Sequence, residues 1–205
     1  MPKIAAIILA AGASSRFGRP KQLLRIADKS LIRRMVDEAR EARSSPVIVV
    51  TGAGSVEINR ELAPSPAISI GNPDWYRGIG TSIRRGIRHL VDNFRDVDAA
   101  VLLVCDQPFA DSKTIRNLIS LREQTKKPIV ACGYANTLGV PALFDRSLFH
   151  EMLAIEDSCG GKPVILRDPE RVAEFPFPEA EIDIDTEEQW NQIQRVTVPR
   201  KTSAA

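Results

Sequence analysis

Short runs of consecutive apolar residues alternate with stretches of helical periodicity along the chain. A continuous apolar run is typical of a strand covered on both faces, because neither side of such a strand meets water. Four segments fit this pattern and predict strands: Ile4–Ala10, Val47–Thr51, Ala99–Val104 and Ile129–Ala131.

Helices are predicted between these strands, where apolar residues recur at helical spacing over 31–39, 83–94 and 115–122. Ser30 is a candidate N-cap for the first helix, Thr81 or Ser82 for the second, and Asp111 with Ser112 marks the start of the third. Strands that alternate with helices indicate βαβ units and a mainly parallel sheet, so the predicted fold class is α/β.

The alternation weakens after Gly133. Residues 139–144 predict a short strand or a sheet edge, because Pro141 has no N–H to donate to a central ladder. The later pattern predicts a helix over 148–155, a turn over 159–162, short strands over 164–166 and 172–177, and a closing helix over 187–195. We predict one domain over residues 1–196 and a frayed tail over 197–205.

Length and charge narrow the classes of function. A chain of 205 residues suits one ordinary domain. Its 28 basic and 26 acidic residues give a net charge of +2, which argues for neither a nucleic acid nor an anionic membrane as partner. The longest apolar run is far below the roughly 20 residues that span a bilayer, and three cysteines without a CxxC pair predict no disulfide scaffold or zinc site. We expect a cytoplasmic protein.

The segment richest in chemistry follows the first predicted strand and reads LAAGASSRFGRPK, from Leu9 to Lys21. Small residues and glycines let backbone N–H groups approach phosphate oxygens closely, and ligands of open α/β sheets bind at the carboxyl ends of strands. Arg16 and Lys21 would neutralise a polyphosphate there. The spacing is neither a Walker A motif nor a dinucleotide fingerprint, and a strand-to-helix turn with solvated basic residues is the alternative.

Two further segments carry carboxylates. A buried strand ends at Asp106, where an acid can hold a nucleotide-bound Mg²⁺, which takes one or two carboxylates and completes its shell with phosphate oxygens and water; the alternative is a cap of the turn before Pro108. Asp183 and Asp185, two residues apart on an extended segment, could share a cation. Asp185 could instead cap the helix that begins near Glu187.

The segment 72–82 has the glycines and hydroxyls of a helix start, and a helix N-terminus presents free N–H groups. An ordinary capped helix after a turn is the alternative. Cys105, inside a predicted buried strand, is expected to be core.

The sequence LAAGASSRFGRPK resembles the L-A-[AG]-G-x-S-x-R-[FM]-G-x-x-K signature of the MobA-like nucleotidyltransferases, which include molybdenum-cofactor guanylyltransferase and cytidylyltransferase. The resemblance covers about residues 3–195. It implies a single-domain, Rossmann-like three-layer sandwich of the nucleotide-diphospho-sugar transferase type. It also implies Mg²⁺-dependent transfer of a nucleoside monophosphate from an NTP to a phosphorylated acceptor, with release of pyrophosphate.

The resemblance further implies a substrate preference. Ala11 stands where the guanylyltransferases usually have a second glycine and is similar to the cytidylyltransferase branch, so CTP is favoured over GTP. Molybdopterin is the implied acceptor, and a molybdoenzyme is an implied protein partner. Two other functions stay open: a nucleotidyltransferase acting on a sugar or polyol phosphate, and a non-catalytic nucleotide-binding accessory protein of a molybdoenzyme.

Site residues also follow from the resemblance. Arg16, Lys21 and Asp106 are implied to be catalytic, and Asp106 with Asp185, which is favoured over Asp183, to hold the metal. The implied nucleotide-binding residues are Leu9, Ala10, Ala11, Gly12, Ser14, Ser15, Arg16, Lys21, Gly80, Thr81 and Ser82. The implied acceptor-binding residues are Gly139, Pro141, Gly161 and Lys162. The run Cys159-Gly160-Gly161-Lys162-Pro163 departs from the G-D-x-G-A-R run of the family, which leaves the acceptor open.

Overall fold

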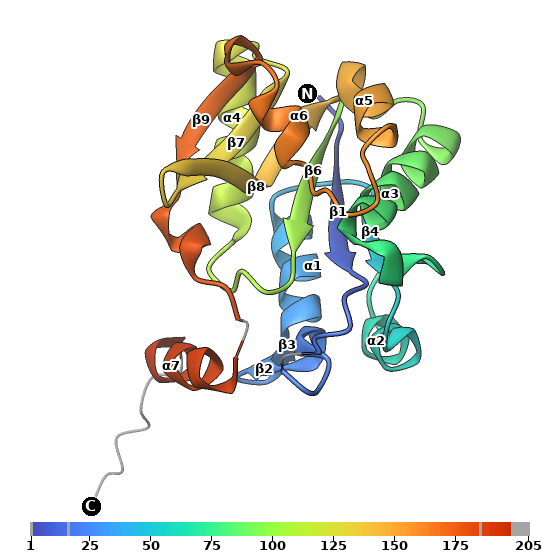
Figure 1. Cartoon of the computed structure of the whole chain (residues 1–205), viewed down its shortest axis with the longest axis vertical. Helices are drawn as coiled ribbons and strands as arrows, with labels where there is room; N and C mark the ends of the chain where they lie inside the picture. The colour runs from blue at the N-terminus through green and yellow to red at the C-terminus, as the bar shows by residue number, and fades with distance from the viewer. Residues whose placement is uncertain (1, 16, 185, 198–205) are drawn as a thin grey trace, which may run out of the picture.

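A mixed sheet of seven strands, in the order β5-β4-β1-β6-β8-β7-β9, forms the middle layer of the described residues, 2–15, 17–184 and 186–197 (Figure 1). The structure is a computed structural model. The strands of this sheet are β1 (Ile4–Ala10), β4 (Val47–Thr51), β5 (Ile68–Gly71), β6 (Ala99–Val104), β7 (Ile129–Tyr134), β8 (Thr137–Asp145) and β9 (Val172–Pro176). A separate two-stranded ribbon pairs β2 (Arg25–Ile26) with β3 (Lys29–Ser30).

Helices cover both faces of the sheet. The α-helices are α1 (Leu31–Glu41), α2 (Ser55–Leu62), α3 (Ile79–Asn93), α4 (Ser112–Thr125), α5 (Phe149–Leu153), α6 (Lys162–Leu166) and α7 (Glu187–Thr197). Short 3-10 turns are η1 (Lys21–Leu23), η2 (Trp75–Arg77), η3 (Arg146–Leu148), η4 (Pro169–Arg171) and η5 (Pro178–Glu181). Side chains of α1, α2 and α4 pack on one face, and those of α3, α5 and α6 pack on the other. The predicted three-layer α/β fold is confirmed.

The strand β1 shows why the predicted runs are purely apolar. Ala6 and Ile8 point into one core and Ala5 and Ile7 into the other, so successive side chains are buried on opposite faces. β1 pairs in parallel with both β4 and β6. β1 is therefore covered on both faces and hydrogen-bonded along both edges, which makes it a central strand of the fold.

The strand with Pro141 is interior rather than an edge, which corrects one expectation. β8 lies between β6 and β7 and runs antiparallel to both. The register with β7 passes from Ala142 directly to Gly139, so Val140 and Pro141 lie in a β-bulge and make no ladder pair with β7. A bulge removes the demand for the N–H that proline lacks.

Most predicted helices are confirmed, including the caps by Ser30, which accepts from the N–H of Arg33, and by Asp111, which accepts from that of Thr114. The predicted strand over 164–166 is wrong, because this segment belongs to α6, which starts after Gly161 with a proline in its first turn. The predicted cap of α3 by Thr81 or Ser82 is also wrong, because the helix already begins at Ile79.

The C-terminal helix α7 packs against the loop that follows β1. Trp190 is only 4% exposed and belongs to a separate apolar cluster. This cluster consists of Phe17, Leu24, Ile26, Leu31, Ile184, Trp190 and Ile193. It joins α7 to the loop after β1, to the β2–β3 ribbon and to the start of α1. Of the predicted tail over 197–205, residue 197 ends α7 and the rest lies outside the described residues.

No helix in the described part of the chain has the length and apolar character needed to span a membrane.

The Trp190→Ala variant is expected to lose about 3–5 kcal/mol of unfolding free energy, because a large side chain leaves a cavity that its neighbours fill only partly. Urea unfolding measures this loss. An unchanged m-value would show that the substitution lowers the free energy of unfolding without changing the surface exposed on unfolding. Gln192→Ala, on the exposed side of the same helix, should stay within about 0.5 kcal/mol. A loss below about 1 kcal/mol for Trp190→Ala would contradict the role given to this cluster.

Candidate functional site

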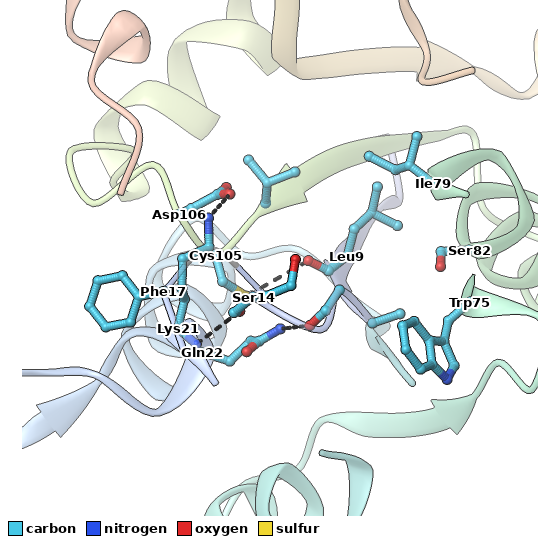
Figure 2. Close-up of a pocket in the computed structure, with 14 residues that line it drawn as sticks. Leu9, Ser14, Phe17, Lys21, Gln22, Trp75, Ile79, Ser82, Cys105 and Asp106 are labelled. Carbon is cyan, nitrogen blue, oxygen red and sulfur yellow. Dashed lines mark hydrogen bonds and ion pairs between the residues drawn. The ribbon is translucent and has the colours of Figure 1, made fainter. Parts of the chain in front are cut away.

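A pocket of about 290 Å³ opens where β1 and β6 end. The two strands are parallel neighbours with Leu9 opposite Val104, so the segments that leave them begin side by side. The lining residues are Leu9, Ala11, Gly12, Ser14, Ser15, Phe17, Lys21, Gln22, Trp75, Ile79, Ser82, Val104, Cys105 and Asp106 (Figure 2). The carboxyl edge of a parallel sheet is the usual place for a ligand in this architecture.

The loop after β1 is held by its own hydrogen bonds. Ser14 adopts a positive φ of 52°, and its carbonyl accepts from the N–H groups of Phe17 (2.9 Å) and Gly18 (3.1 Å). Its hydroxyl oxygen accepts from the N–H of Lys21 at 3.1 Å. These contacts close the loop before Lys21, so that the lysine side chain starts from a fixed point.

Gln22 fastens the first half of the same loop. Its Nε2 donates to the carbonyls of Ala10 (3.1 Å) and Gly12 (2.9 Å), and the residue is 5% exposed. Its Oε1 is buried and has no hydrogen-bond partner among the described residues. Sequence reasoning missed Gln22, because nothing but its position after Lys21 distinguishes it from a surface glutamine.

Lys21 and Asp106 meet across the pocket. The lysine Nζ lies 3.2 Å from Oδ2 of Asp106, with the side chains 14% and 34% exposed (Figure 2). Within the described residues, the Asp106 carboxylate bonds to no N–H of the turn that precedes Pro108. The Asp106 carboxylate thus faces Lys21 and the pocket rather than the N–H groups of the turn.

The third predicted segment reaches the same edge of the sheet. The N–H of Ile184 donates to the carbonyl of Asp106 at 3.0 Å, which places the exposed Asp183 beside the end of β6. Burial raises the pKa of Tyr134, and the negative charge of Asp183 raises it further. Arg16 and Asp185 lie outside the described residues. Among the residues that are described, no three His, Cys, Asp or Glu side chains form a group that could hold a metal ion.

Asn72 organises the start of α3. Its Nδ2 donates to the hydroxyl oxygens of Thr81 (2.8 Å) and Ser82 (2.9 Å). The Thr81 hydroxyl in turn donates to the carbonyl of Gly78 at 2.7 Å, and Thr81 does not line the pocket. Ser82 lines the pocket, and because its oxygen accepts from Asn72, its proton is left to donate.

Gly80 has a packing role instead of a free N–H. Its N–H donates to the carbonyl of Asp157 at 2.9 Å, and a Cβ would overlap the carbonyl oxygen of Glu156. Arg77 pairs with the Asp157 carboxylate at 2.6 Å, and Arg84 forms a second ion pair with it. The 156–159 loop is therefore fastened onto the first turn of α3, and neither Gly80 nor Thr81 lines the pocket.

The predicted acceptor residues lie away from this pocket. A Cβ at Gly139 would overlap the hydroxyl of Tyr134, and one at Gly161 would lie 3.3 Å from the ring of Phe144. Both glycines thus have a packing explanation. Lys162 is exposed at the start of α6, and Pro141 lies in the bulge of β8.

Cys105 lines the pocket as part of its apolar wall. Burial raises the pKa of its thiol far above the ordinary value, so the side chain stays neutral and behaves as a small apolar group. The prediction that it is core is confirmed, since it is 6% exposed. No binding role was predicted from the sequence for the other lining residues Phe17, Ile79 and Val104, although Phe17 belongs to the LAAGASSRFGRPK motif and Ile79 to the segment 72–82.

A sequence model of the MobA-like NTP transferase domain matches residues 6–172, which is most of the chain. The chain belongs to this family of nucleotidyltransferases. It is 26% identical over 141 residues to the bifunctional protein GlmU of Albidiferax ferrireducens, covering 65% of this chain and 30% of GlmU. The MobA-like domain thus spans about a third or less of the curated relatives it matches.

Solved structures resemble the MobA-like domain over nearly its whole length. Rv0371c of Mycobacterium tuberculosis H37Rv is 26% identical with a TM-score of 0.79, covering 95% of this chain and 98% of that one. A complex of Rv0371c with manganese is 24% identical with a TM-score of 0.75, covering 94% and 98%. The CMP:2-keto-3-deoxy-manno-octonic acid synthetase complexed with CTP is 15% identical with a TM-score of 0.72, covering 95% and 98%. Below 25% identity, the likeness shows the fold alone.

Proposed function

We propose that this protein is a metal-dependent nucleotidyltransferase that moves a nucleoside monophosphate from an NTP, preferably CTP, to a phosphorylated acceptor and releases pyrophosphate. The observation that carries the proposal is the meeting of Lys21 and Asp106 at the carboxyl edge of the sheet, 3.2 Å apart in a pocket that the loop after β1 encloses. A cation for the triphosphate and a carboxylate for its metal are the two groups that this reaction requires.

The reaction needs positioning and cancellation of charge more than covalent help from the protein. An acceptor phosphate oxygen attacks the α-phosphorus in line, the bond from that phosphorus to the bridging oxygen breaks, and pyrophosphate leaves with the electron pair. Lys21, together with Arg16, would hold the triphosphate and the departing pyrophosphate. Backbone and side-chain groups of the loop from Leu9 to Ser15 and the Ser82 hydroxyl would orient the nucleoside.

The residues present fit a bound Mg²⁺. Asp106 is partly exposed in the pocket wall, and Mg²⁺ is commonly held by one or two carboxylates with phosphate oxygens and water filling its shell. Asp106 would hold it with the help of Asp185, and the ion would supply neutralisation of the phosphate oxygens. The manganese complex of Rv0371c supports a divalent cation in this fold.

For the acceptor we propose a pterin phosphate, as in molybdopterin, bound near the β8 bulge and the start of α6, where Gly139, Pro141, Gly161 and Lys162 lie. The motif LAAGASSRFGRPK supports this branch, and a molybdoenzyme would then receive the product. A sugar or polyol phosphate is the second candidate, and the similar fold of the CMP:2-keto-3-deoxy-manno-octonic acid synthetase, which is named for a sugar-derived acid, supports an acceptor of the sugar class.

A pyrophosphate-release assay tests the proposed function and separates its alternatives. CTP and GTP are each supplied with molybdopterin, with a sugar 1-phosphate or with no acceptor, in the presence of Mg²⁺. Release that depends on molybdopterin supports the first acceptor, and release that depends on the sugar phosphate supports the second. NTP binding without release under every condition would favour the non-catalytic accessory protein.

In the same assay, Asp106→Asn is expected to lower the rate on the order of 10²-fold or more while thermal stability barely moves, because the amide keeps the shape and loses the charge. Asp92→Asn, an exposed change on α3 outside the pocket lining, is the matched control and should keep the parent rate. Lost folding of Asp106→Asn without a specific loss of Mg²⁺ dependence would instead support the turn-cap role.

Lys21→Ala should weaken binding of CTP and of inorganic tripolyphosphate alike, by about 10- to 100-fold, because both lose the same charge-assisted contact. Isothermal titration at constant ionic strength measures both affinities. Lys29→Ala, whose ammonium pairs with Asp37 at the surface, is the control. Unchanged CTP affinity in Lys21→Ala would remove the lysine from the triphosphate site.

CTP should be turned over faster than GTP, and Ala11→Gly should narrow the difference. Ala11 lines the pocket and its carbonyl accepts from the N–H of Ala53 at 3.0 Å, so its methyl group is held in place. One methyl group discriminates by about 1–3 kcal/mol at most, roughly a 5- to 150-fold ratio. Competition between equal amounts of the two nucleotides measures the ratio of CTP turnover to GTP turnover. Equal turnover of both by the parent, or the same ratio in Ala11→Gly as in the parent, would refute the role of Ala11 in base selection.

A further inference from the structure

The pocket has two chemically different ends. The charged groups, Lys21 and Asp106, lie at one end, where Phe17 also lies, whereas the indole of Trp75 and the side chain of Ile79 lie at the other, with the Ser82 hydroxyl between them (Figure 2). A nucleotide has the same division, with anionic phosphates at one end and a flat aromatic base at the other. If the phosphates bind at Lys21, the length of the pocket carries the base toward Trp75.

Trp75 is held in place from behind. A Cβ at Gly52 would lie 2.7 Å from both Cβ and Cγ of the tryptophan, so the side chain rests directly on the glycine backbone. The 3-10 turn that carries it begins after Asp74, whose N–H donates to Oδ1 of Asn72 at 3.0 Å. Trp75 is therefore an aromatic wall with little freedom to move before a ligand arrives.

The exposure of the ring distinguishes it from a core residue. The chain has two tryptophans. Trp190 is buried, whereas Trp75 is half-buried and lines the pocket, with its neighbour Tyr76 meeting it edge-on at 6.3 Å between ring centroids. A large apolar ring left partly open at a pocket wall is poorly explained by packing alone.

We propose that Trp75 is the nucleobase-stacking residue of this site. The inference rests on the proposed function, since it takes the triphosphate to lie at Lys21. A stacking wall recognises the π-face that every base has, so it strengthens binding of all nucleotides without choosing among them. Base selection then rests with groups that meet the base edge or crowd it, such as the Ser82 hydroxyl and the Ala11 methyl group.

Equilibrium binding of CTP, GTP and inorganic tripolyphosphate to the full chain, with Mg²⁺ present, tests the role. Trp75→Ala should weaken both nucleotides by about 5- to 150-fold and leave tripolyphosphate within about twofold. Trp75→Phe, which keeps an aromatic face, should recover most of the loss, and Trp75→Leu, which keeps only apolar bulk, should not. Val56→Ala, which removes an exposed apolar side chain on α2 outside the pocket lining, is the control and should bind like the parent.

Fluorescence gives a second readout that does not depend on how Trp75→Ala folds. In a Trp190→Phe background Trp75 is the single indole, and its emission should be quenched by CTP and by GTP but not by tripolyphosphate. Equal losses for CTP and tripolyphosphate in Trp75→Ala, full recovery by Trp75→Leu, or no quenching by bound CTP would each overturn the stacking role. A parent that binds tripolyphosphate no more weakly than CTP would also overturn it while leaving the phosphate site standing. A parent that binds neither would overturn the proposed function itself.

Discussion

The parallel pairing of β1 with β6 is the constraint on which the site depends. Leu9 lies opposite Val104 in that ladder, so the loop after β1 and the acid after β6 start side by side. A slip of one residue would exchange the side chains of β1 between the two cores, so that Ala5 and Ile7 would take the places of Ala6 and Ile8 and disrupt the packing on both faces. The same register places Lys21, eleven residues beyond the strand, within 3.2 Å of Asp106. The formation of the sheet therefore brings Lys21 and Asp106 close together.

Three independent contacts preserve this arrangement at the loops, where the sheet itself gives no support. Gln22 ties down two carbonyls on the first half of the loop after β1. Phe17, in its second half, is buried with Trp190 and Ile184, and the N–H of Ile184 reaches the carbonyl of Asp106. On the opposite side, Asp157 fastens the start of α3 through Arg77 and Arg84. Pre-organised groups of this kind stabilise a charged transition state without reorganising during the reaction.

The sequence predicted well those features that depend on local pattern. Continuous apolar runs located the central strands, and the β1 loop and the end of β6 located Lys21 and Asp106. The errors arose where tertiary context overrides local preference. Pro141 suggested an edge, but a bulge admits it to an interior strand. Gly80 suggested an open helix start, but it is a glycine because the 156–159 loop packs against it. The segment 72–82, which contains Trp75, was singled out for its glycines and hydroxyls, but neither Trp75 nor Gln22 was assigned a role, because their importance lies in which pocket wall or backbone carbonyl they meet.

The ion pair between Lys21 and Asp106 also bears on how the site accommodates its ligand. The Lys21 side chain is mostly buried, the Asp106 side chain is partly exposed, and each charge is compensated by the other. Under the proposed function, a nucleotide carrying a divalent cation would offer a replacement partner to both at once, because its phosphates would contact the lysine and its metal would contact the carboxylate. Under the proposed function, the lysine and the carboxylate would thus each exchange one oppositely charged partner for another. A free triphosphate or a free metal ion satisfies only one side of the pair. If Lys21 and Asp106 have the proposed roles, the site would therefore bind the metal–nucleotide complex in preference to either component alone.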